Sequence, residues 1–199
     1  MAQIRWHRTA VAAARADGDV AVLLGGDCTL VLGAVAGLRR QERASGEVGV
    51  FYLDGDADLD TPQEGWGILD SCGVAHLLGD GDPQLAAVRP GGPLLDAASL
   101  VLFGFHPAQL PAGQWRRFAG HGLYGVPITA MPPGTAGRRA GQALAGCRTS
   151  APCCATWTSM SSTMHSSRWP TAPATTAGCP CQTSSTPSQP PPGIPGWLA

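Results

Sequence analysis

Residues 48–60 read Val-Gly-Val-Phe-Tyr-Leu-Asp-Gly-Asp-Ala-Asp-Leu-Asp, and this stretch decides the fold class. Its first six residues are an apolar run bounded by polar sequence, which is typical of a strand buried on both faces. Carboxylates follow at alternate positions, namely Asp54, Asp56, Asp58 and Asp60. Because ligands bind beyond the carboxyl ends of the strands in parallel α/β sheets, the segment predicts a buried strand with a site at its end.

The carboxylates of this cluster repel one another unless a cation or hydrogen-bond donors offset their charge. Clusters of oxygen ligands suit Mg²⁺, Mn²⁺ or Ca²⁺. A solvated acidic turn that caps the next element is one alternative. A phosphatase-like loop, with Asp54 as nucleophile and Asp56 as general acid, is another. An EF-hand is disfavoured because Leu59 and Gly65 stand where its loop needs Gly and Glu.

Outward from this segment, apolar runs alternate with helix-favouring stretches. Strands are expected over residues 20–24, 100–105 and 125–128, and helices over 8–16, 30–40, 71–78 and 135–146. Strands that alternate with helices predict an α/β fold, with three layers (α/β/α) and a mostly parallel sheet covered on both faces.

A second candidate site lies at residues 24–29, Leu-Gly-Gly-Asp-Cys-Thr, between an expected strand and an expected helix. Glycines there let the backbone approach a ligand, and a helix N-terminus favours anions. The same residues also suit a tight turn in which Asp27 or Thr29 caps the helix. Cys28 is either a soft metal ligand or a small buried hydrophobic residue.

Charge and composition argue against two classes of protein and also distinguish the acidic first part of the chain from its tail. The 199 residues carry a net charge of −1 with no basic patch, which argues against nucleic-acid binding. No apolar run approaches the roughly 20 residues of a membrane helix, so a cytoplasmic protein is expected.

All 14 acidic residues lie at or before Asp96. We therefore expect a partial α/β domain over 1–146 and an irregular tail, rich in Ser, Thr, Pro and Cys, over 147–199.

The tail also suggests an error in the reading frame. Lys and Asn are absent from the chain, which indicates a GC-rich coding sequence. A frame that takes the third base of each written codon and the first two of the next gives Asp-Val-Asp-Val across residues 157–161. We hypothesise that the frame shifts after about Cys147.

Together these segments resemble the motifs of the arginase–agmatinase–formiminoglutamase family, the ureohydrolases. Residues 25–29 resemble its Gly-Gly-Asp-His-Ser motif, and residues 54–58 its Asp-Ala-His-x-Asp motif. Residues 59–62 resemble an Asn-Thr-Pro continuation, and 67–73 stand where the family has Gly-Asn-Leu-His-Gly-x-Pro. The Asp-Val-Asp-Val that the shifted frame gives corresponds to the family's last metal motif, Asp-x-Asp. The resemblance covers about residues 20–146 and implies an N-terminally truncated, incomplete arginase-like fold.

The resemblance implies hydrolysis of guanidino or amidino carbon–nitrogen bonds in small molecules like arginine, agmatine or formiminoglutamate. In the family a hydroxide bridging two Mn²⁺ ions attacks the carbon, and the subunits form trimers or hexamers. Carried over by position, the metal ligands are Cys28, Asp54, Asp56 and Asp58, and Asp70 replaces a proton-shuttling His. Because Cys28, Asp56 and Asp70 all stand where the family has His, we expect one ion or none and impaired activity. A non-catalytic metal-binding member is the alternative.

Overall fold

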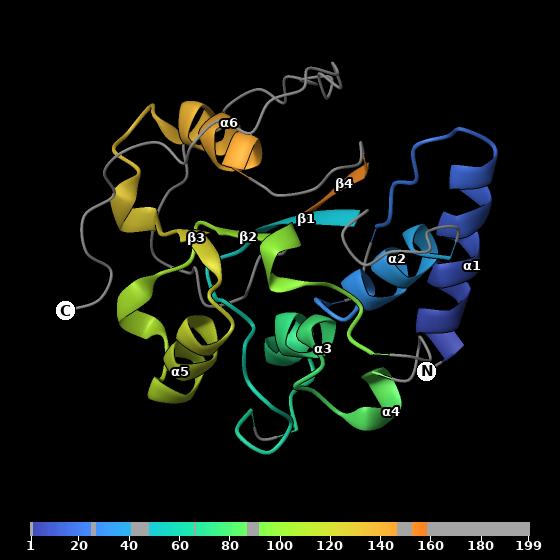
Figure 1. The fold of residues 1–199 in the computed structure, drawn as a ribbon, viewed down its shortest axis with the longest axis horizontal. Helices are drawn as coiled ribbons and strands as arrows, with labels where there is room; N and C mark the ends of the chain where they lie inside the picture. Colours follow the sequence, from blue (N-terminus) through green and yellow to red (C-terminus); the bar gives the residue numbers. More distant parts are fainter. Residues whose placement is uncertain are drawn as a thin grey trace. The chain divides into compact units, whose positions relative to one another are not determined.

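Four parallel strands in the order β3-β2-β1-β4 form the central sheet of the computed structural model (Figure 1). The structure describes residues 2–24, 27–40, 48–65, 67–86, 92–146 and 153–158, the last range by its backbone alone. The chain divides into two compact units, 1–166 and 167–199, and every described residue belongs to the first.

The strands are β1 (Val48–Leu53), β2 (Leu100–Phe103), β3 (Tyr124–Val126) and β4 (Cys153–Thr158). The α-helices are α1 (Ala2–Ala16), α2 (Leu30–Leu38), α3 (Gly73–Leu78), α4 (Pro83–Ala86), α5 (Ala112–Gly120) and α6 (Ala136–Gly146). Short 3-10 turns lie at Asp70–Cys72, Ala97–Ser99, Pro107–Gln109 and Ile128–Ala130.

The sheet has a core on each face, since alternate side chains of a strand point to opposite sides. Val50 and Tyr52 of β1 belong to the larger core, to which α1, α2 and α3 also contribute. Phe51, between them, packs in a smaller core that contains Ala143 of α6. Figure 1 shows α6 on one side of the sheet and α3 and α5 on the other. The expected three-layer, parallel arrangement is therefore confirmed.

One expected strand is wrong. Residues 20–24 form no strand, and Val20, Val22 and Leu24 are 89%, 75% and 91% exposed. A strand needs a neighbour for its backbone hydrogen bonds. None of the four described strands pairs with this segment. The apolar composition was right for a strand, but the partner is missing from the described sheet.

Other element boundaries differ for local reasons. The strand expected over 100–105 ends at Phe103, because Gly104 adopts a φ of +97°. The strand expected over 125–128 spans Tyr124–Val126, and Pro127 behind it has no N–H to extend the ladder. The first helix begins earlier than expected, at Ala2.

Three elements fall where the sequence indicated none. Helices α4 and α5 were not predicted, and β4 lies inside the tail that was expected to be irregular. The remaining tail residues lie outside the described residues. Strand β4 runs parallel to β1, with Thr158 opposite Leu53.

Candidate metal centre

Three of the five predicted site residues converge at the carboxyl end of β1. One ligand atom each from Cys28, Asp54 and Asp58 lies within 4.8 Å of the other two, and all three side chains are buried. Cys28 Sγ is 3.8 Å from Asp54 Oδ2 and also hydrogen-bonds the Asp58 carboxyl group. Cys28 thus meets two carboxylates that follow it by 26 and 30 positions in the sequence. They meet at the carboxyl end of β1, where parallel α/β sheets place their ligands.

Asp54 is fixed by the sheet itself. Its N–H donates a 3.1 Å hydrogen bond to the Phe103 carbonyl, which continues the β1–β2 ladder one step past the strand. Its Oδ1 accepts the Asp56 N–H at 3.1 Å. Gly104 lies against this turn, and a Cβ there would come within 3.2 Å of the Asp54 carbonyl oxygen. The backbone therefore holds the Asp54 carboxylate at the carboxyl end of β1.

Asp58 is held from two sides. Its φ of +48° is the one positive value at a non-glycine position among the described residues. In this conformation its carbonyl accepts the N–H groups of Val74 and Ala75, at 3.0 and 3.1 Å, at the start of α3. The Tyr52 hydroxyl donates a hydrogen bond to Asp58 Oδ2. Helix α3 therefore fixes the backbone of Asp58, and β1 fixes its side chain.

The charges in this buried cluster are strongly coupled. Burial, followed by the charge of Asp54, raises the pKa of Asp58 to about 8, although hydrogen bonds from Tyr52 and Cys28 oppose the shift. Burial and the nearby Asp58 also raise the pKa of Tyr52 well above its usual range. A second buried negative charge is unfavourable without a counter-ion. The cluster therefore holds a proton near neutral pH, in a place that a cation would stabilise better.

The other two predicted site residues bind backbone groups. Asp56 is half-buried, outside the three-residue cluster, and its Oδ1 accepts the N–H of Ala57 at 2.7 Å. Asp70 is exposed, and its Oδ1 accepts the N–H of Cys28 at 3.2 Å. Asp70 thereby holds the loop that carries Cys28.

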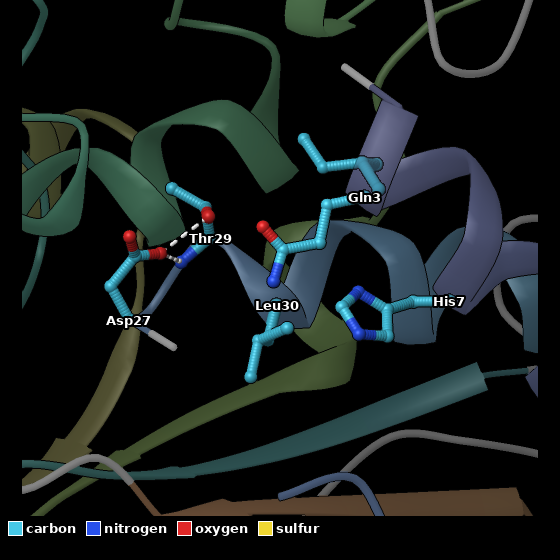
Figure 2. Close-up of a pocket in the computed structure, with 6 residues that line it drawn as sticks. Gln3, His7, Asp27, Thr29 and Leu30 are labelled. Atoms are coloured by element: carbon cyan, nitrogen blue, oxygen red, sulfur yellow. Dashed lines mark hydrogen bonds between the residues drawn. The ribbon is translucent and has the colours of Figure 1, made fainter. Parts of the chain in front are cut away.

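The capping interpretation of residues 27–29 is correct in part. Thr29 is the N-cap of α2, but its side chain makes no capping hydrogen bond. Asp27 Oδ1 instead accepts the Thr29 N–H at 2.9 Å and its hydroxyl at 2.5 Å. A hollow beside this turn is shown in Figure 2, and none of the five predicted site residues lines it; its lining comprises Gln3, Ile4, His7, Asp27, Thr29 and Leu30.

Sequence reasoning missed the residues that support the cluster. Tyr52 was visible as a hydroxyl in a buried strand, and such a hydroxyl requires a partner. Helix α5 holds the loop after the cluster, because buried Gln114 hydrogen-bonds Asp60 and Arg117 donates to the Leu59 carbonyl at 3.0 Å. Arg117 also pairs with Glu64. No signal in residues 112–120 pointed to this contact.

The donor set fits one divalent cation. A thiolate and two carboxylates would more than offset its two positive charges, and three protein ligands leave a position open for water. Among the described residues no second set of ligands is gathered, since Asp56 is turned to its own backbone. Positions 159–161 of the Asp-Val-Asp-Val motif in the shifted frame lie outside the described residues.

The fold is similar to those of solved arginases. The arginase of Bacillus subtilis subsp. subtilis str. 168 matches with a TM-score of 0.68 at 18% identity, over 77% of this chain and 51% of that one. The Bacillus caldovelox arginase matches with 0.68 at 20% identity, over 77% and 50%. The cold-adapted arginase of the yeast Glaciozyma antarctica matches with 0.63 at 23% identity, over 77% and 54%.

These matches confirm the expected arginase-like α/β fold, and the chain spans about half the length of the arginases that it matches. No family model matches the chain, and no curated protein matches its sequence. Among the described helices, none has the length and apolar character needed to cross a membrane.

Proposed function

We propose that this chain belongs to the arginase family and derives from a metal-dependent hydrolase of guanidino or amidino carbon–nitrogen bonds, with impaired activity. One observation carries the proposal, namely the meeting of Cys28, Asp54 and Asp58 at the end of a parallel strand. The arginase-like fold and the order of the motifs support it. The substrate would be a small molecule like arginine, agmatine or formiminoglutamate, as the resemblance implies.

Cys28, Asp54 and Asp58 would hold the cation, and Tyr52 would keep the Asp58 carboxylate oriented toward it. The resemblance implies Mn²⁺, an ion that the two carboxylates suit. A bound divalent cation supplies hydroxide at neutral pH and stabilises the charge of a tetrahedral intermediate. Asp70, exposed beside the Cys28 loop, would move the proton that a family His moves. A carboxylate does this less readily near pH 7 than an imidazole, which accounts for impaired turnover.

A non-catalytic metal-binding role is the second candidate, and the geometry of Asp56 and Asp70 favours it. Both carboxylates stand where the family has His, and both accept backbone N–H groups instead. A protein that kept the cluster but lost these two histidines would bind metal without turnover. The phosphatase-like alternative fits less well, because Asp54, its nucleophile, is only 3% exposed.

The frame hypothesis is consistent with the position of β4. The strand runs parallel to β1 and pairs Thr158 with Leu53, the residue that precedes Asp54. In the shifted frame this is where an Asp-x-Asp pair would stand. The nucleotide sequence between codons 146 and 157 tests the hypothesis directly, and an intact frame there would refute it.

The test of function measures metal binding and turnover on the same purified protein. We expect one ion per chain by calorimetric titration and slow, metal-dependent urea release from arginine or agmatine, or formamide release from formiminoglutamate. Asp54→Asn should abolish both, whereas Asp19→Asn, an exposed carboxylate outside the cluster, should leave both unchanged. Metal binding without turnover would establish the non-catalytic role. Hydrolysis of a phosphate ester that Asp54→Asn removes would support the phosphatase alternative, and no bound metal would overturn the proposal.

A further inference from the structure

We infer that the Cys28–Asp54–Asp58 cluster is a zinc site, in which the thiol of Cys28 shifts the preference of the centre away from Mn²⁺. This inference rests on the proposed function, because it concerns the metal of the same centre. The family resemblance implies a manganese pair, so the inference is a departure from it.

The distance between the ligand atoms is compatible with a tetrahedral ion. With Zn–S near 2.3 Å and Zn–O near 2.0 Å, sulfur and oxygen on one tetrahedral zinc lie about 3.5 Å apart. Cys28 Sγ and Asp54 Oδ2 are separated by 3.8 Å. Ligands at right angles on an octahedral ion would lie closer together than in the tetrahedral case. The observed separation therefore needs only a small contraction to match tetrahedral zinc.

The number and type of ligands point the same way. Thiolate is a soft ligand that selects Zn²⁺, whereas Mn²⁺ prefers six oxygen ligands. The described residues gather three ligand side chains, all buried, which matches the three protein ligands of an open zinc site. Among the described residues a manganese ion would find only three of the six ligands that it prefers.

The thiol is also held in place before any metal binds. The Cys28 N–H donates to Asp70 Oδ1 at 3.2 Å. On the other side Cys28 packs against the start of α3, where a Cβ at Gly73 would lie 3.4 Å from the Cys28 carbonyl oxygen. Both of its carboxylate neighbours are hydrogen-bonded to the thiol. A fixed thiol between two carboxylates is thus part of the centre.

A second buried cysteine supplies the matched control. Cys72 is buried, like Cys28, but its Sγ donates to the Ile68 carbonyl at 3.3 Å and it is absent from the three-residue cluster. Replacement of either thiol removes one buried sulfur. Only replacement of Cys28 should change the choice of metal.

The experiment measures the ratio of Zn²⁺ to Mn²⁺ affinity, by competition titration under reducing conditions, in the full chain and in Cys28→Asp and Cys72→Ser. We expect Cys28→Asp, which makes the site all-oxygen, to lower this ratio at least tenfold, and Cys72→Ser to leave it unchanged. Co²⁺ bound to the unmodified protein should show a thiolate-to-cobalt charge-transfer band in the near ultraviolet. This second readout does not depend on the folding of a variant.

An unchanged ratio in a folded Cys28→Asp protein, or the absence of the charge-transfer band from the cobalt-loaded chain, would overturn the zinc inference. Those results with a metal still bound would leave the proposed function intact. Failure to bind Zn²⁺, Mn²⁺ and Co²⁺ alike would overturn both.

Discussion

The hydroxyl of Tyr52, the last but one residue of β1 and a member of the larger core, donates a hydrogen bond to Oδ2 of Asp58. The bond joins the larger hydrophobic core directly to the candidate metal centre. It also uses one of the two oxygens of Asp58, which orients the other. Tyr52 is fully buried, so no water can replace it as the donor.

Tyr52→Phe should therefore weaken both the fold and the metal centre. Loss of a buried hydrogen bond to a carboxyl group costs about 1–3 kcal/mol of unfolding free energy. Loss of a residue that orients a metal ligand lowers metal affinity by roughly 10- to 100-fold. Denaturant unfolding and zinc titration would measure the two effects. Tyr124→Phe is the control, since Tyr124 is 38% exposed and should change neither quantity.

The stability of the metal-free protein should fall as the pH rises. The pKa of Asp58 is about 8 in the folded state, against an ordinary value near 4, so the folded protein binds the proton more tightly than the unfolded chain. The contribution of Asp58 to the free energy of unfolding is complete below about pH 4 and is lost as the pH rises through about 8. The slope is at most about 1.4 kcal/mol per pH unit. Unfolding measured in chelator between pH 5 and pH 8 would show it.

Asp58→Asn separates this contribution from those of other groups. The amide keeps an oxygen for the Tyr52 hydroxyl but cannot ionise, so the variant should lose less stability than the parent between pH 5 and pH 8. At pH 8 it should be the more stable of the two without metal, and it should bind metal more weakly. Parallel pH profiles for the two proteins would contradict the assignment of the raised pKa to Asp58.

Two substitutions of Asp70 should distinguish its positioning role from a role in proton transfer. Asp70→Asn keeps an oxygen that can accept the Cys28 N–H, so metal affinity should stay within about threefold of the parent. Asp70→Ala removes the acceptor and should weaken metal binding by about tenfold. If Asp70 carries a proton, both variants lose turnover. Turnover that persists in Asp70→Asn would leave only the positioning role.

The part of the fold that could be predicted from the sequence is the part that local pattern determines. Residues 48–53 are apolar and residues 54–60 are alternately acidic, so the strand and the candidate site at its end could be predicted without knowledge of any partner. The meeting of Cys28 with Asp54 and Asp58 required the resemblance, because a lone cysteine has no periodicity. The roles of Tyr52 and Gln114 depend on contacts across the chain, which local pattern does not specify.

At residues 20–24 the local pattern predicted a strand that the structure does not contain. The exposure of these residues can be tested. Its composition favours a strand, yet Val22 is 75% exposed and no described strand pairs with it. Val22→Thr should therefore change the unfolding free energy by less than about 0.5 kcal/mol. Val50→Thr, in the core of β1, should cost at least about 1 kcal/mol because it buries a hydroxyl among apolar side chains. Equal losses in the two variants would mean that residues 20–24 are packed.

Repair of the reading frame should add a second metal ion. Strand β4 runs beside β1 with Thr158 opposite Leu53, and Asp54 is the next residue after Leu53. Carboxylates in an Asp-x-Asp pair that begins opposite Leu53 would lie at the same carboxyl-terminal end of the parallel strands as the Cys28–Asp54–Asp58 cluster. They would supply the ligands that a second ion lacks among the described residues. We expect metal analysis to give one ion per chain for the protein as written and two for the repaired protein, with turnover rising in parallel. Conversion of both restored Asp residues to Asn in the repaired chain should return the count to one, because the first cluster does not depend on them. A repaired protein that still holds one ion would show that this end of β4 is not part of the centre.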